Sequence, residues 1–433
     1  MSTLSELLKE KDKLPTGNVY RKTINSKSYY YYQYFKNGQR YSELLKSAEV
    51  KKLVPLILKR QKIERQIKEL LNKEREVKMS FSMKRLSGHI MSGDVPVARF
   101  EDGIMFSYHE SLAPLIIQRT HSIEKFLKLR MIDLTRTNAR LLLKSLSIHV
   151  DEDYETPLYA YALSVNDNYW FRPNKSKLKY KDIIFKEDNY FDTSLKGDTT
   201  VFFHKSKLTP EITTTGSFEK GWKLINNHWW LYKVGNNKQL FSELFCYEFA
   251  KLIGLKTAKY EYSDGYIRSK NFAEKYNFEP IASLADDNDD YDYVFSILYK
   301  LDKSIAKDYL KMIMFDSVVY NIDRHNENLG LLRDRSSGKI LSLAPNFDNN
   351  LALFSSIDYL KNPTKDNFLQ MLVKFLKNNK EARNLYKTIK FKNITKEKIK
   401  ECIDKIPIKL KESVGLEESI YTRYEYLRNL FTK

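Results

Sequence analysis

The segment NIDRHNENLGLL, residues 321–332, gathers acidic, basic and amide side chains beside an apolar run. Asp323 and Asn328 are five positions apart. At this spacing one loop can offer a carboxylate to a substrate hydroxyl and an amide oxygen to a metal ion. Either residue alone would indicate no more than a polar turn with a helix cap. The pair therefore points to chemistry only if other parts of a site accompany it.

A second part follows at Asp348, near the end of ILSLAPNFDNN. The apolar run LGLL, the turn-rich RDRSSGK and the run ILSL predict a β-hairpin that returns Asp348 beside Asn328. Mg²⁺ prefers oxygen ligands, so we expect these two side chains to share a Mg²⁺ ion. Phosphotransferases use this order of loop, hairpin and aspartate. In protein kinases the loop is H-R-D-x-x-x-x-N, whereas here Arg and His follow the aspartate.

A lysine on a strand and a flexible loop before it are the remaining expected parts. WWLYKVG places Lys233 on a strand, and a buried lysine requires a charged partner, either phosphate or Glu243 on the next helix. Upstream, LTPEITTTGSFEKGW puts Gly216 and several hydroxyls in a turn whose N–H groups can hold phosphate. One glycine makes neither a GxGxxG loop nor a Walker A loop, so an ordinary β-turn stays an open alternative.

The elements that must position these residues predict an α+β fold of two lobes with a cleft between them. Strand signals dominate residues 151–300, with one helix at 241–255, and helical periodicity dominates residues 301–433. The expected strands are LYAYALSV, TTVFFHK, WWLYKV, AKYEYSD and GYIRSKNF. The expected helices after residue 300 are SIAKDYLKMIMFDSVVYN, NFLQMLVKFLKN, EKIKECIDKI and SIYTRYEYLRNLF. Residues 78–150 indicate a small α+β segment without visible chemistry.

Residues 1–77 form a separate basic segment, in which Lys and Arg outnumber Asp and Glu about two to one. The Tyr-rich residues 18–42 predict a small hairpin or three-stranded meander with a turn at Asn37–Gly38. Residues 47–77 predict a long helix. Its apolar face is expected to hold Leu53, Leu56, Ile63, Ile67 and Leu70. Exposed Tyr and Lys would suit a nucleic acid, but we favour a docking or dimerising appendage, because alternating Tyr is also typical of an ordinary half-buried strand.

The composition limits the class of protein. The chain has 433 residues, a net charge of +19 and 42% hydrophobic residues, which indicates folded domains. Its apolar stretches are too short to span a bilayer, and we expect no membrane association and no secretory signal. Two isolated cysteines, Cys246 and Cys402, exclude a disulfide framework or a Cys-based zinc site and indicate the cytoplasm. The positive charge fits an acidic partner, but a chain rich in Lys, Asn, Ile and Tyr is also typical of AT-rich genomes.

The ordered motifs resemble those of HipA-like serine/threonine kinases, above all the versions from Gram-positive bacteria and their mobile elements. LTPEITTTGSFEK, WWLYKVG, FSELFCYEFAKLIGL, YIRSKNF, NIDRHNENLGLL and LAPNFDNN follow one another here as in that family, within residues 150–380. The resemblance implies a two-lobed protein-kinase-like fold, a strand-rich N-lobe before a helical C-lobe, that binds ATP and Mg²⁺.

The resemblance also implies a role for each matching residue. Asp323 is the catalytic base, Asn328 and Asp348 hold Mg²⁺, and Lys233 acts in catalysis by contacting the α- and β-phosphates. Lys270 and Phe272 stand at the adenine hinge. The other expected nucleotide contacts are Thr215, Gly216, Ser217, Lys220, Glu243, His325, Asn328 and Asp348.

Regulation and partners are implied in the same way. Family members autophosphorylate a serine of the phosphate loop and eject the loop, and Thr213 stands at that position here. Family kinases often act as toxins on translation components such as an aminoacyl-tRNA synthetase, and a DNA-binding antitoxin neutralises them. We therefore expect a protein substrate, a DNA-binding antitoxin and DNA contact through residues 1–77. The chain departs from the family in having Thr in place of Ser, and residues 1–77 lie outside the family pattern.

Two other functions are compatible with the residues. A small-molecule phosphotransferase uses the same Asp-x₄-Asn…Asp arrangement. A nucleic-acid-binding regulator with a relic kinase fold would explain the basic residues 1–77. A relic need not retain Lys233, Asp323, Asn328 and Asp348, whose burial costs desolvation energy. We therefore rank the kinase first and the relic last.

Overall fold

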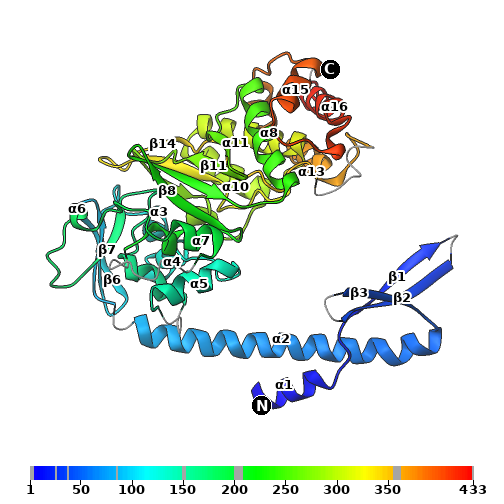
Figure 1. Ribbon diagram of the computed structural model, residues 1–433, viewed down its shortest axis with the longest axis horizontal. Helices are drawn as coiled ribbons and strands as arrows, with labels where there is room; N and C mark the ends of the chain where they lie inside the picture. Colours follow the sequence, from blue (N-terminus) through cyan, green and yellow to red (C-terminus); the bar gives the residue numbers. More distant parts are fainter. Residues whose placement is uncertain are drawn as a thin grey trace. The chain divides into compact units, whose positions relative to one another are not determined.

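The computed structural model describes residues 4–24, 27–36, 39–83, 86–148, 153–198, 208–354 and 362–431. The chain forms two compact units, residues 1–84 and residues 85–433. Within these described ranges, strands pair into four sheets of three or four strands, and all these strand pairings are antiparallel. The fold is therefore α+β, as the sequence predicts (Figure 1).

The smaller unit consists of a meander and a long helix. Its elements are α1 (Leu4–Asp12), β1 (Asn18–Ile24), β2 (Lys27–Lys36), β3 (Gln39–Leu45) and α2 (Ser47–Met83). The strand order β1-β2-β3 is the expected three-stranded meander. Its expected Asn37–Gly38 turn lies outside the described residues.

Helix α2 differs from the prediction in length and in part of its apolar face. It continues to Met83, beyond the expected end at residue 77. Ile63 and Ile67 are buried against Leu7 of α1, as expected for that face. Leu56 was predicted wrongly: it is 43% exposed, and the adjacent Ile57 is buried instead. Helix α1 packs over Ile63 and Ile67, so this part of the apolar face of α2 is buried. The expected side chain of Leu70 lies outside the described part.

The described part of the larger unit contains three antiparallel sheets. Their strand orders are β6-β5-β4-β7, β10-β11-β9-β8 and β12-β13-β14. The strands are β4 (Gly88–Ser92), β5 (Val95–Glu101), β6 (Ile104–Tyr108), β7 (Tyr169–Pro173), β8 (Lys220–Ile225), β9 (His228–Lys233), β10 (Tyr260–Ser263), β11 (Tyr266–Lys270), β12 (Tyr276–Pro280), β13 (Gly330–Asp334) and β14 (Ile340–Leu343). The expected strands at WWLYKV, AKYEYSD, GYIRSKNF and LGLL are confirmed.

One expected strand was wrong and another is untested. LYAYALSV, residues 158–165, continues the 3₁₀ helix η1 (Asp153–Ala160) into a turn. Pro157 lacks a backbone donor, and Tyr161 and Ala162 have φ near +55°, so this segment cannot extend as a ladder strand. TTVFFHK, residues 199–205, lies outside the described residues.

The helices of the larger unit match the sequence well after residue 300. Before it they are α3 (Leu115–Thr120), α4 (Ile123–Lys128), α5 (Thr137–Ser145), α6 (Tyr180–Ile183), α7 (Phe191–Lys196), η2 (Pro210–Thr213), α8 (Asn237–Ile253), α9 (Ala282–Ala285) and α10 (Tyr291–Leu301). After it they are α11 (Lys303–Val319), α13 (Asn367–Asn378), α14 (Lys380–Lys387), α15 (Lys396–Asp404), η3 (Lys411–Ser413) and α16 (Leu416–Arg428).

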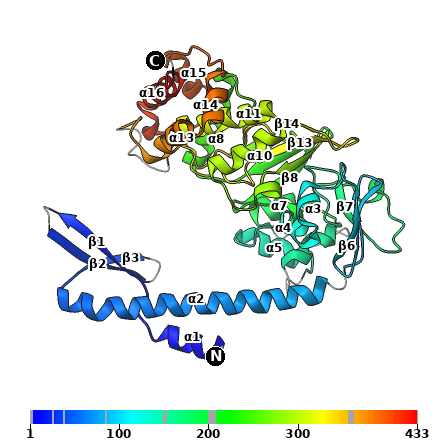
Figure 2. The ribbon, with the colours of Figure 1, turned by 180° about the vertical axis from the view of Figure 1, so that it is seen from behind.

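One hydrophobic core joins α8 to the C-terminal helices. Phe245 and Phe249 of α8 are fully buried with Phe315 of α11 and with Leu376 and Leu427 further along the chain. Figure 2 shows α8 beside the C-terminal helices α13, α15 and α16. This core fixes α8 against the helical part, so residues on α8 have defined positions relative to α11 and to the loop after it. In the described residues no helix is both long enough and apolar enough to cross a bilayer.

Candidate active site

One cavity of the larger unit is lined by nearly all the residues that the sequence singles out. We call it the site cavity. The expected residues in its lining are Thr213, Thr215, Gly216, Ser217, Lys220, Lys233, Lys270, Phe272, Asp323, His325, Asn328 and Asp348. Glu243 is the exception, because it lies behind Lys233 and does not reach the cavity. The fold thus brings together segments more than a hundred residues apart in the chain.

Lys233 has the charged partner that its burial requires. It ends β9 with a 6% exposed fraction, and its Nζ donates to Glu243 Oε1 at 3.0 Å and to Asp348 Oδ1 at 2.6 Å. Burial alone would lower the pKa of Lys233, but the carboxylates of Asp348 and Glu243 outweigh it and raise that pKa well above its usual value. The pairing expected with Glu243 is present, and Asp348 is a second partner.

The N-terminal cap of helix α8 fixes the position of Glu243. The Asn236 side chain accepts hydrogen bonds from the N–H groups of Lys238 and Gln239, which caps the helix three residues after Lys233. Glu243 then lies about two turns into the helix, and its Oε2 accepts the N–H of Asn349 at 3.0 Å. Glu243 therefore links the lysine strand to the loop that carries Asp348.

Asp348 lies in a loop and not at the end of a strand. Strand β14 ends at Leu343, and Asp348 has the left-handed φ of +58°, which an Asp tolerates better than most residues. Its N–H donates to the hydroxyl of Tyr260 at 2.9 Å. Burial opposes ionisation of Asp348, but Lys233 and Lys220 outweigh this effect and hold its pKa well below the usual range. The group is therefore a carboxylate at neutral pH.

Lys220 and Lys233 lie directly opposite each other on the paired strands β8 and β9. Like charges in this position repel, and Lys233 is offset by its two carboxylates. Lys220 is 5% exposed and its ammonium has no hydrogen bond to the described residues. Burial lowers the pKa of Lys220 to about 8. A buried cation that lines a cavity and whose ammonium forms no hydrogen bond is suited to bind an anion.

The loop over these lysines requires a glycine. Gly216 has φ +91°, and a Cβ at this position would lie 2.4 Å from Nζ of Lys220. The loop backbone therefore approaches the ammonium as closely as only glycine permits. Arg136, just before α5, is buried and donates from Nη2 to the carbonyl of Thr214 at 2.7 Å, which anchors the loop from behind.

Thr213 is held inside the structure. It is 7% exposed, and its hydroxyl donates to the carbonyl of Leu163 at 2.7 Å. Thr214 likewise donates to the carbonyl of Pro210, at 2.8 Å. A phosphate could be added at Thr213 only after these bonds break and the loop moves.

Asp323 and Asn328 belong to a loop that closes on itself. Nδ2 of Asn328 donates to the carbonyl of Asp323 at 3.1 Å, which leaves the amide oxygen of Asn328 as its acceptor toward the cavity. Asp323 is half-buried, and desolvation raises its pKa, with a smaller opposite effect from His325. A carboxylate with a raised pKa, beside a cavity, is suited to accept a proton.

Arg324 organises this region, and the sequence analysis assigned it no role. Its side chain is 5% exposed and forms a two-pronged ion pair with Asp316 of α11, at 3.0 Å for each contact. Its other acceptors are the carbonyls of Asn328 and Phe347, at 2.6 and 2.7 Å, and the amide oxygens of Asn346 and Asn349, at 2.6 and 3.0 Å. Burial opposes its charge, but Asp316 outweighs this effect and raises the pKa of Arg324. Arg324 thus ties the Asp323–Asn328 loop to the Asp348 loop.

The expected hinge forms an aromatic wall. Lys270 ends β11, and Phe272 follows it with its ring 5.4 Å from that of Phe347 and 5.6 Å from that of Phe278. All four side chains line the site cavity. The rings meet edge-on or tilted, and aromatic surfaces of this kind suit a flat ring such as a nucleobase. His325 lies at the rim and is exposed.

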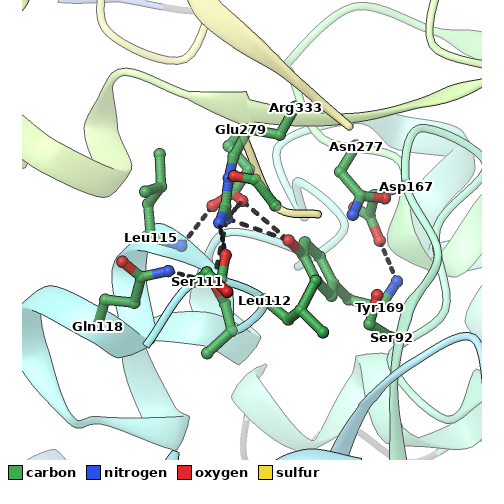
Figure 3. A network of polar contacts seen from close by, with 12 residues as sticks. Ser92, Ser111, Leu112, Leu115, Gln118, Asp167, Tyr169, Asn277, Glu279 and Arg333 are labelled. Carbon is green, nitrogen blue, oxygen red and sulfur yellow. Dashed lines mark hydrogen bonds and ion pairs between the residues drawn. The ribbon is translucent and has the colours of Figure 1, made fainter. Parts of the chain in front are cut away.

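A wall that the sequence analysis did not anticipate completes the cavity. It comes from residues 114–130 and 164–169, the first of which showed no visible chemistry in the sequence. Figure 3 shows the network that fixes it, in which Arg333 donates to Glu279 and to Tyr169 OH, the latter at 3.1 Å. Glu279 Oε2 accepts the N–H of Leu115 at 2.5 Å, so α3 is attached to β12, the strand that follows the hinge residues Lys270 and Phe272. These contacts join residues 164 positions apart, which local patterns cannot reveal.

The arrangement fits a Mg²⁺ ion bound with a nucleotide. The described residues contain no group of three or more His, Cys, Asp or Glu that could hold a metal on its own. Asn328 and Asp348 both face the cavity and supply an amide and a carboxylate oxygen. Mg²⁺ commonly takes one or two protein oxygens and completes its shell with phosphate and water.

In the smaller unit, tyrosines interact with each other. The rings of Tyr32 and Tyr34 stack at 5.1 Å, and those of Tyr34 and Tyr41 at 5.5 Å. Tyr34 donates its hydroxyl to Glu43 at 2.6 Å. This stack accounts for part of the Tyr-rich pattern by packing within the sheet. DNA contact through residues 1–77 stays a prediction.

Comparison with known proteins gives loose similarities. No protein-family model matches the chain, and no curated protein matches it. Among solved structures it is similar to the Helicobacter pylori proinflammatory kinase CtkA, with a TM-score of 0.39 and 22% identity over 48% of this chain and 90% of that chain. It is also similar to a chain of the Shewanella oneidensis MR-1 toxin–antitoxin complex of HipA, HipB and operator DNA. There the TM-score is 0.47 with 12% identity, over 80% of this chain and 97% of that chain. The chemistry of the site therefore rests on its own geometry.

Proposed function

We propose that this protein is an ATP- and Mg²⁺-dependent kinase that transfers the γ-phosphoryl group to a serine or threonine hydroxyl of a protein. One observation supports this most directly. The buried Lys233, paired with Glu243 and Asp348, lines the same cavity as Asp323 and Asn328. A cation for phosphates, oxygen ligands for Mg²⁺ and a base for a hydroxyl are the parts that phosphoryl transfer needs.

Each residue has a defined task in this mechanism. Lys233 and Lys220 attract the phosphate oxygens, and Gly216 lets the loop backbone approach them. Asn328 and Asp348 would hold Mg²⁺, which neutralises charge on the phosphates. Asp323 orients the acceptor hydroxyl and takes its proton as the oxygen bonds to the γ-phosphorus and ADP leaves. Most of the rate enhancement then comes from positioning and electrostatics.

We also propose that the kinase phosphorylates its own loop at Thr213. The support is the motif resemblance together with the position of Thr213 in the lining of the cavity. Because Thr213 is buried and hydrogen-bonded, its phosphorylation would expel the loop from over Lys220 and lower ATP binding. A role as a cytoplasmic toxin acting on a translation component, with a DNA-binding antitoxin, is proposed on the motif resemblance.

Mass spectrometry of the purified protein after incubation with Mg²⁺-ATP tests the proposal. We expect phosphate on residues 213–217 of the natural protein. Asp323→Asn or Asp348→Asn should lower phosphate transfer by about 10² or more while the melting temperature changes little for Asp323→Asn. Asp404→Asn, an exposed carboxylate paired with Lys400 on α15, is the matched control and should retain activity.

The contrary results are equally clear. Equal phosphate transfer by Asp323→Asn and the natural protein would remove Asp323 from the mechanism. If neither protein gains phosphate, and ATP does not shift the melting temperature, the relic interpretation is favoured instead.

A further inference from the structure

The site cavity extends beyond the groups assigned to the nucleotide, to a wall that has no role in the proposed function. We call it the acceptor wall and define it as Pro114, Ile116, Phe126 and Leu129, all of which line the cavity. These residues belong to α3, α4 and the residues flanking them. Three of the four are buried within the protein, and Leu129 is half-buried. The wall is thus an apolar surface in the same cavity as the carboxylate of Asp323.

A chain of hydrogen bonds connects the acceptor wall to the catalytic loop. Nδ2 of Asn326 donates to the carbonyl of Asp286 at 2.9 Å, and the N–H of Ala282 donates to the carbonyl of Asn326. Arg119 of α3 in turn donates to the carbonyl of Ser283 at 2.8 Å and pairs with Asp286. The loop of Asp323, helix α9 and helix α3 therefore form one continuous side of the cavity.

A second chain of contacts connects the same wall to the phosphate loop. Arg130, which follows Leu129, donates to the carbonyl of Ala162 at 2.9 Å and to Asp167 at 2.7 Å. The next carbonyl, that of Leu163, accepts the hydroxyl of Thr213. The acceptor wall is therefore attached to the loops on both sides of it, the one that carries Asp323 and the one that carries Thr213. An extended peptide segment, which presents single side chains to separate pockets, suits a site between two such loops.

The charged groups beside the acceptor wall are paired with one another. Arg130 and Asp167 form a buried ion pair, and the Arg130 guanidinium also lies over the ring of Phe126 at 4.3 Å. Glu279, which lines the cavity nearby, is paired with Arg333. An acceptor is therefore not selected there by a charged neighbour. An apolar side chain gains most from leaving water at such a surface.

We propose that the acceptor wall is a substrate subsite that binds a large apolar side chain next to the reacting serine or threonine of an extended peptide segment. This rests on the proposed kinase function and specifies its substrate class. The apolar side chain packs on Phe126 and Leu129, and this places the hydroxyl at Asp323. The O–H proton passes to Asp323, the hydroxyl oxygen bonds to the γ-phosphorus, and the bond to the ADP oxygen breaks.

Leu129 is the residue at which the proposal is best tested. It is half-buried at the end of α4, so a lysine there can extend its ammonium toward the cavity while α4 keeps its buried contacts. The natural full-length chain and Leu129→Lys are given positional-scanning Ser/Thr peptide libraries with Mg²⁺-ATP. Leu252→Lys is the matched control, because Leu252 of α8 is also half-buried and does not line the cavity.

We expect the natural protein to prefer peptides with a large apolar residue beside the acceptor by on the order of tenfold over alanine. Leu129→Lys should lose this preference and favour Asp or Glu at the same peptide position. Leu252→Lys should behave as the natural protein. A preference that survives in Leu129→Lys would overturn the subsite.

The remaining outcomes separate the subsite from the kinase function. Peptide phosphorylation without any apolar preference overturns the subsite and leaves the kinase standing. Transfer to small hydroxyl compounds but to no peptide overturns the peptide subsite in favour of a small-molecule acceptor. If the natural protein transfers phosphate neither to itself nor to any peptide, and so behaves as Asp323→Asn is expected to behave, both proposals are wrong.

Discussion

Lys220 and Lys233 show how two identical residues on facing strands take on different electrostatic roles. Both are buried and directly opposite one another. Lys233 is paired with two carboxylates, which raise its pKa, whereas desolvation lowers the pKa of Lys220 to about 8. Lys233 is therefore held in place by its two carboxylates, whereas Lys220 forms no hydrogen bond to the described residues, and both ammonium groups line the cavity in which we propose that the phosphates bind.

The pH dependence of nucleotide binding should follow Lys220. Below about pH 8 its ammonium is charged and attracts phosphate, and above that pH the amine is neutral. We expect the dissociation constant of Mg²⁺-ATP to rise as the pH increases from 7 to 9, measured by calorimetry. Lys220→Met should bind more weakly at pH 7 and lose this dependence. A dependence that persists in Lys220→Met would assign it to another group.

Lys220 also makes the stability of the folded protein depend on pH. Its pKa is about 8 in the folded protein against 10.5 for an ordinary lysine, so the unfolded chain binds more protons between these values. The contribution of Lys220 to the free energy of unfolding therefore rises as the pH increases from about 8 to about 10.5. Below pH 8 the full cost of burying the charged ammonium is present. Lys220→Met should remove that cost and unfold at a higher temperature at pH 7.

At the scale of elements, Arg324 couples the loop after α11 to the loop after β14. It contacts the carbonyls of Asn328 and Phe347, one from each loop, while Asp316 on α11 neutralises it. The hairpin of β13 and β14 brings the two loops near each other, and Arg324 sets their separation. The positions of Asn328 and Asp348 depend on this contact, because Asp348 directly follows Phe347.

Replacement of Arg324 by lysine tests whether activity depends on the charge of this side chain or on its hydrogen bonds to the two loops. Lysine keeps the positive charge beside Asp316 but cannot reach acceptors on both loops. We expect turnover to fall by on the order of 10² through misplacement of the two loops. Arg324→Ala leaves Asp316 unpaired and should destabilise the fold by about 3–5 kcal/mol, measured by chemical denaturation. Arg268→Lys, a half-exposed arginine paired with Glu261, is the control and should change neither value appreciably.

At the scale of the whole molecule, the chain divides into two compact units at residue 84. The smaller unit has its own apolar cluster of Leu7, Ile63 and Ile67, and the larger one contains every residue of the site cavity. The proposed catalysis therefore requires residues of the larger unit alone. DNA contact through the basic residues 1–77 stays a prediction, with duplex DNA as the expected ligand.

Removal of residues 1–84 tests this division. We expect the chain of residues 85–433 to keep a cooperative thermal transition and to phosphorylate residues 213–217 at an unchanged rate. Duplex DNA binding by the full chain, measured by fluorescence anisotropy, should weaken steeply with salt and be lost in the shortened chain. A shortened chain that aggregates or loses activity would show that the units depend on each other.

The amino-acid sequence by itself determined the class of fold, most of the elements and most of the residues that it singles out and that line the site cavity. Helices such as α13 and strands such as β9 are set by local periodicity, and the Asp323–Asn328 spacing lies within one loop. Local signals failed at residues 158–165, which follow Pro157 and contain the left-handed residues Tyr161 and Ala162.

Only the tertiary structure decided how these residues act together. The ion pairs of Lys233 with Asp348, 115 positions away, and of Arg324 with Asp316 depend on desolvation inside the folded molecule. The acceptor wall likewise exists because contacts such as that of Glu279 with Leu115 attach α3 to the hinge. Burial, charge pairing and cavity shape arise from long-range packing, which has no local pattern in the chain.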